Sequence, residues 1–182
     1  MSNKIILVVV LAVVVIGIGY WILQSQKEVG QPTGTQEFTL DPQNCTYVVE
    51  GKNITLVNGY SEEEIVPGSA SKIITRYFGN EASGDFNNDG ISDVAFLLTQ
   101  DPGGSGTFYY AVVALAGNNK CNGTNAILLG DRIAPQTTNF QNGEIVVNYA
   151  ERKSDEPMTA SPSVGVSKYL QISGDQLVEI NK

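Results

Sequence analysis

The stretch DVAFLLTQDPGGSGTFYYAVVALA, residues 93–116, decides the fold of this chain. Residues 93–100 and 107–116 are apolar at both odd and even positions, a pattern typical of strands that are covered on both faces. The connection between them, PGGSG at residues 102–106, consists of residues that form turns. The stretch therefore predicts two central strands joined by a hairpin loop.

Strand patterns continue on both sides of this hairpin, separated by short turn-forming segments that favour antiparallel pairing. The other predicted strands are 46–50, 54–57, 126–130, 137–140, 144–150, 168–172 and 177–180, with turns at Gly51–Asn53, Gln141–Gly143 and Ser173–Gln176. Two weak helix signals are present. Ser61–Glu64 resembles a capping box, and residues 69–78 fit either a strand or a short helix. We predict a mostly-β domain over residues 41–182, an antiparallel sandwich or a curved sheet with at most one or two short helices.

A second long apolar run, IILVVVLAVVVIGIGYWIL, occupies residues 5–23 and contains no charge. As a helix it would be about 28 Å long, close to the hydrocarbon thickness of a bilayer. Tyr20 and Trp21 at its end favour the headgroup level, and Lys4 before it places the N-terminus in the cytoplasm by the positive-inside rule. We predict a single-pass transmembrane signal anchor at residues 1–23, with a cleaved signal peptide or a buried core helix as the alternatives.

Residues 24–40 are polar and contain Gly, Pro, Thr and Gln, a composition typical of a flexible stalk. The domain at 41–182 is therefore expected outside the cytoplasmic membrane, tethered to the lipid bilayer through residues 5–23. The chain has 19 acidic and 11 basic residues and a formal net charge of −8. This charge argues against a nucleic-acid partner.

The chain contains no histidine, which excludes Ser–His and Cys–His dyads and removes the commonest zinc ligand. Ser69-Ala70-Ser71-Lys72 matches the S-x-x-K motif of penicillin-recognising enzymes, but no K-T-G element accompanies it. The sequence offers no convincing catalytic set, and we do not expect an enzyme.

Cys45 and Cys121 are the only cysteines. Outside the cytoplasmic membrane they are expected to be oxidised to a disulfide, which would tie the first strand of the domain to the loop after residue 116. The alternative is two unrelated buried thiols.

Residues 85–93 carry oxygen-bearing side chains at loop positions 1, 3, 5 and 9 and a glycine, Gly90, at position 6. This is the spacing of calcium loops, in which the glycine permits a sharp turn and position 7 offers its carbonyl. The predicted calcium ligands are the side chains of Asp85, Asn87, Asp89 and Asp93 and the carbonyl of Ile91. Phe96 stands where an EF-hand has its glutamate, so the remaining ligands would be water or distant groups. A polar hairpin turn without metal is the alternative.

Three further residues are candidate ligand contacts on the central hairpin: Ser105, Tyr109 and Tyr110. Ser105 lies at the tip of the predicted loop, and tyrosine rings can stack on sugars, although packing in the core is the other interpretation of the tyrosines. Asp131-Arg132 is expected to form a charge pair at a strand end, with a binding role as the alternative.

Three segments together resemble a group of small bacterial envelope proteins. They are GDFNNDGISDVAFLLTQDPGGSGTFYYAVVAL (84–115), LLGDRIAPQT (128–137) and EPMTASPSVGVSKYL (156–170). Proteins of that group have an N-terminal anchor or signal and one extracytoplasmic domain without an assigned activity, so the resemblance implies a bacterial origin and an outward-facing domain. The loop at 85–93 also resembles the calcium loops of FG-GAP-type β-propeller repeats, but a propeller needs several copies.

The functional expectation is a membrane-tethered extracytoplasmic β domain with a structural calcium, acting as a binding or envelope-structural module. Its partner would be an unidentified envelope protein or glycan. The alternatives are an envelope hydrolase that uses carboxylates or the metal, and a receptor for a small ligand or glycan.

Overall fold

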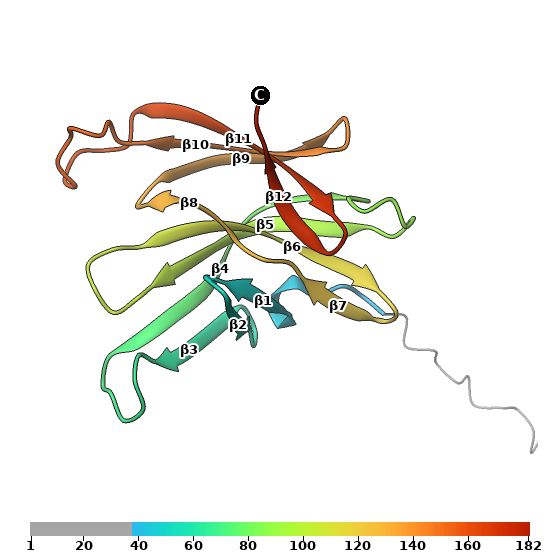
Figure 1. Cartoon of the computed structure of the whole chain (residues 1–182), viewed down its shortest axis with the longest axis horizontal. Helices are drawn as coiled ribbons and strands as arrows, with labels where there is room; N and C mark the ends of the chain where they lie inside the picture. Colours follow the sequence, from blue (N-terminus) through green and yellow to red (C-terminus); the bar gives the residue numbers. More distant parts are fainter. Residues whose placement is uncertain (1–37) are drawn as a thin grey trace, which may run out of the picture. The chain divides into compact units, whose positions relative to one another are not determined.

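The structure, a computed structural model, describes residues 38–182 (Figure 1). The predicted anchor at 1–23 and nearly all of the predicted stalk at 24–40 lie outside the described residues. Phe38–Lys182 form one unit by their contacts. No helix in this described part has the length and hydropathy that a membrane span requires.

Strands make up almost all of the regular structure from residue 38 to residue 182. Their bounds are β1 (Thr46–Val49), β2 (Lys52–Thr55), β3 (Tyr60–Glu64), β4 (Lys72–Gly84), β5 (Asp93–Asp101), β6 (Phe108–Gly117), β7 (Lys120–Gly123), β8 (Ile127–Asp131), β9 (Ala134–Gln141), β10 (Glu144–Glu151), β11 (Val164–Ser173) and β12 (Gln176–Ile180). One short 3₁₀ turn, η1 (Pro42–Asn44), precedes them. The prediction of a mostly-β, antiparallel domain is confirmed.

The larger sheet has the order β3-β4-β5-β6-β7, and β8 pairs with β6 beside β7. All of its neighbouring strands are antiparallel. β5 and β6 are central and buried along almost their whole length, as the sequence predicts. The segment 102–106 is the loop that joins them, so the predicted hairpin is confirmed.

The smaller sheet, β12-β11-β10-β9, packs on one face of β5 and β6. Residues from both sheets form this core cluster, among them Leu97, Val113, Val147 and Leu170, which are at most 1% exposed. Asn125, which lies between β7 and β8, joins the larger sheet to β12 at the edge of the smaller sheet. Its side-chain amide donates to the Leu177 carbonyl at 2.9 Å and accepts from the Leu177 N–H at 2.8 Å.

The β1–β2 hairpin covers the opposite face of β5 and β6 through a second core cluster. Tyr47, Leu56, Phe96 and Leu98 are among its fully buried members. Figure 1 shows the resulting three levels, with β9–β12 on one side of the central strands and β1–β2 on the other. Cover on both faces explains why β5 and β6 carry apolar residues on both of their faces.

Turn chemistry fixes the hairpin registers, and one turn differs from its predicted place. Asn142 and Gly143 join β9 to β10 with positive φ angles of 54° and 79°, as a two-residue hairpin turn requires. The first hairpin turns at Glu50 and Gly51, with φ of 49° and 78°. Lys52 and Asn53, predicted in the turn, therefore belong to β2.

The weak helix signals are not realised in the fold. Ser61–Glu64 lies in β3 and residues 72–78 lie in β4, paired with each other in antiparallel register. Helix propensity is a weak preference, and in this case the hydrogen bonds of the sheet edge decide the conformation.

Candidate functional site

The loop between β4 and β5 contains the predicted calcium ligands, and its side chains bind its own backbone. The Asp85 carboxylate accepts from the N–H groups of Asp89 at 3.0 Å and Gly90 at 2.9 Å. Asn87 accepts from Asp89 N–H at 3.1 Å, and Asp89 accepts from Ile91 N–H at 2.8 Å. Gly90 has a φ of +86°, which is the sharp turn that the spacing predicts.

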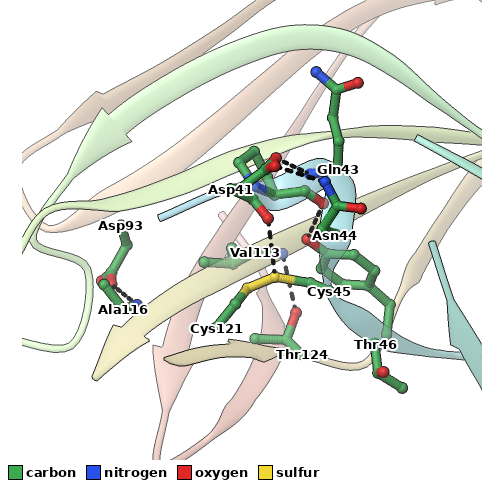
Figure 2. The surroundings of a disulfide bond; sticks show 12 residues. Asp41, Gln43, Asn44, Cys45, Thr46, Asp93, Val113, Ala116, Cys121 and Thr124 are labelled. Carbon is green, nitrogen blue, oxygen red and sulfur yellow. Dashed lines mark hydrogen bonds between the residues drawn. A yellow bond between two sulfur atoms is a disulfide. The ribbon is translucent and has the colours of Figure 1, made fainter. Parts of the chain in front are cut away.

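Asp93 has a different environment from the rest of this loop. It is completely buried, and its two carboxylate oxygens accept from Phe86 N–H at 3.0 Å and Ala116 N–H at 2.9 Å. Figure 2 shows the bond to Ala116. Burial, followed by repulsion from Asp89 and Asp85, raises the pKa of this carboxyl, although the two backbone hydrogen bonds oppose the shift. Asp93 therefore joins the β4–β5 loop to the end of β6.

Phe86 holds the same loop from its apolar side. It is 5% exposed, and its ring meets Phe140 of β9 edge-on at a centroid distance of 4.7 Å. Over residues 38–182, no three His, Cys, Asp or Glu side chains gather closely enough to hold a metal ion. The structure thus brings Asp85, Asn87 and Asp89 into one turn and directs the Asp93 oxygens to backbone amides. The calcium site stays a prediction.

The ligand-contact candidates of the central hairpin do not share a surface. Ser105 is exposed in the loop, and Tyr109 is partly buried against Phe78, with ring centroids 5.3 Å apart. Tyr110 is 2% exposed and donates to Glu50 Oε1 at 2.8 Å. Burial and this hydrogen bond raise the pKa of the Tyr110 hydroxyl. Because adjacent residues of a strand face opposite sides of the sheet, Tyr109 and Tyr110 do not form a joint platform.

Cys45 and Cys121 form a disulfide, as the sequence predicts (Figure 2). Their Cα atoms lie 5.8 Å apart, within the usual range for a bridge. Cys45 follows η1, in which the Gln43 N–H is capped by the Asp41 carboxylate, and Cys121 lies in β7. The bond therefore ties the start of the described chain to the edge of the larger sheet.

The predicted charge pair at the end of β8 is present. Asp131 accepts from the Arg132 guanidinium at 2.8 Å and from Thr107 N–H at 2.9 Å. The hydrogen bond from Arg132 is the main reason that the pKa of Asp131 lies below its usual value of 3.8. The pair joins the end of β8 to the segment that leads into β6.

Arg152 lies beside this pair, and sequence patterns gave no sign of its role. Its Nε donates to the Ala160 carbonyl at 2.6 Å, and its Nη1 donates to the carbonyls of Arg132 at 3.1 Å and Asp131 at 3.4 Å. These bonds hold the connection between β10 and β11 against the end of β8. A cleft of about 260 Å³ opens between the two segments.

Replacing Asp131 by asparagine is expected to make the fold less sensitive to acid. A carboxyl whose pKa is lowered by folding stabilises the fold above its unfolded pKa, and this contribution is lost as the pH falls through the folded pKa. Melting temperatures measured from neutral pH to about pH 3 should therefore fall less steeply for Asp131→Asn than for the wild type. Asp175→Asn, which changes an exposed acid in a turn, is the control and should follow the wild-type profile.

No protein-family model, no curated protein sequence and no solved structure matches this chain.

Proposed function

We propose that this chain is a membrane-tethered binding or envelope-structural module, with the β domain outside the cytoplasmic membrane. The disulfide is the observation that carries the proposal, because structural disulfides form and persist in oxidising compartments and are rare in the cytosol. The apolar run at residues 5–23 and the polar segment after it supply the tether.

Thiol trapping in intact cells that make the full chain tests this proposal. Free thiols are labelled with a membrane-permeant maleimide that increases the mass of the protein. One sample is labelled without reduction and a second is labelled after reduction. The expected result is no added mass before reduction and two additions after it. Cys45→Ser, which leaves Cys121 without its partner, is the positive control for labelling. Two additions without reductant would contradict an oxidising location.

We also propose that the loop at residues 85–93 binds one calcium ion that stabilises the domain. Support comes from the spacing of its oxygen ligands and from the turn at Gly90. In addition, within residues 38–182 none of its three carboxylates forms a salt bridge with a lysine or arginine. Each carboxylate oxygen that accepts one N–H keeps a second lone pair for a ligand. The Ile91 carbonyl would complete the protein's contribution to the ion.

Calcium at about 10 mM is expected to stabilise the wild-type protein by about 1.4 to 2.7 kcal/mol, if the loop has the affinity of about 10⁻⁴–10⁻³ M found in extracellular modules. Thermal unfolding with calcium and with EDTA measures this shift. Asp89→Asn should remove most of the calcium-dependent shift, because it removes one of the three carboxylates that would hold the ion. Asp89 is exposed, so the change leaves the core intact. Asp155→Asn should keep the shift, and identical midpoints for the wild type in both buffers would disprove the site.

A further inference from the structure

We propose that the cleft beside Arg152 binds the carboxyl terminus of a peptide whose last side chain is apolar. This cleft, called the Arg152 cleft below, is defined by Asp131, Ile133, Arg152, Lys153 and Met158. The inference rests on the proposed function as a binding module and gives the chemistry of its partner.

The Arg152 cleft lies where two distant segments of the chain meet. One is the end of β8 and the start of β9, and the other is the connection from β10 to β11. The volume of about 260 Å³ admits one or two amino-acid residues but is below the usual size of a cofactor site.

The guanidinium of Arg152 is fixed and partly unused. Its Nε and Nη1 groups donate to three backbone carbonyls, so its position is set before any ligand arrives. Its Nη2 group has no hydrogen-bond partner within residues 38–182, and this nitrogen is not fully buried. No carboxylate forms a salt bridge with Arg152 in this part of the chain. A positioned, charged N–H group that is open to solvent is suited to bind a carboxylate.

Lys153 supplies a second cation at the same cleft. Its side chain is 61% exposed, and its ammonium is 3.6 Å from Glu156, a loose pair that leaves it able to turn toward a ligand. Asp131, Glu151 and Glu156 also line the cleft. These acids also repel a carboxylate, so binding depends on direct contact with Arg152 and Lys153, and they repel a doubly charged phosphate more strongly still.

Met158 and Ile133 give the cleft an apolar wall. Met158 is 47% exposed and Ile133 is 7% exposed, so a ligand that covers Met158 gains burial of apolar surface. A carboxylate at the two cations together with an apolar side chain at Met158 is the arrangement of a peptide carboxyl terminus.

Titrations followed by NMR test the proposal on the oxidised full-length protein in detergent micelles. The probes are acetyl-Ala-Leu with a free carboxylate and the same peptide as its carboxamide. The expected result is that the carboxylate shifts the amide signals of residues 130–133, 151–156 and 158 and binds about tenfold more tightly than the carboxamide. Lys153→Ala and Met158→Ala, which change exposed side chains, should each weaken binding. Lys52→Ala, an exposed lysine on β2, should bind as the wild type does.

Several outcomes would overturn the inference. These are equal binding of the two peptides, tighter binding of inorganic phosphate, signal shifts confined to other residues, or no shift at about 10 mM peptide. Arg152→Lys is not used as a test of peptide binding, because it would also remove the hydrogen bonds that hold the β10–β11 connection. Thiol trapping decides the location of the domain independently, so failure of the peptide site and failure of the proposed function are distinguishable.

Discussion

Replacing both Cys45 and Cys121 by serine is expected to lower the free energy of unfolding by about 4 kcal/mol. The bridge joins residues 76 positions apart, and closing so long a loop removes many conformations from the unfolded chain. In the folded domain it holds η1 to β7, a strand of four residues at the edge of the larger sheet. Guanidinium unfolding of the oxidised wild type and of the double serine variant measures the difference.

Chemical reduction supplies the control for this prediction. Dithiothreitol should destabilise the wild type by the same amount as the double substitution and should leave the double variant unchanged. A loss below about 1 kcal/mol would mean that the unfolded chain gains little freedom when the bridge is absent. The disulfide would then mark the compartment without stabilising the fold.

The sequence predicts the centre of the fold better than its edges. Residues 93–100 and 107–116 are apolar on both faces, a pattern typical of a strand between two layers. β3 carries three consecutive glutamates, Glu62 to Glu64, and glutamate is depleted in strands. Its conformation comes from pairing with β4, which the local sequence does not specify. β7 is similar, because KCNG has no strand pattern and becomes a strand beside β6.

The candidate sites show the same division between local and distant information. The spacing from Asp85 to Asp93 predicts the turn at Gly90, because the residues of one short loop determine that turn. The orientation of the Asp93 carboxylate depends on Ala116, which is 23 positions away. The Arg152 cleft depends on backbone carbonyls of Asp131, Arg132 and Ala160. Carbonyls are present at every residue, so no motif of side chains marks such a site.

Replacing Asp93 by alanine is expected to lower the free energy of unfolding by about 3 kcal/mol, even in EDTA. The change leaves the buried N–H groups of Phe86 and Ala116 without acceptors, and each such group costs about 1–3 kcal/mol. Removing a desolvated carboxylate recovers part of this loss. Asp93→Asn should cost less than Asp93→Ala, because its amide oxygen still accepts one of the two N–H groups.

Unfolding in EDTA and in calcium separates a structural role of Asp93 from a role as metal ligand. If Asp93 acts by joining the β4–β5 loop to β6, Asp93→Ala is destabilised in both buffers. Asp89→Ala, which loses two exposed hydrogen bonds, from Ile91 N–H and from the Asn87 amide, should cost less than about 1 kcal/mol in EDTA. If Asp93 acted only through calcium, Asp93→Ala would match the wild type in EDTA. That result would contradict the structural role, since both of its hydrogen bonds to buried backbone amides form without a metal.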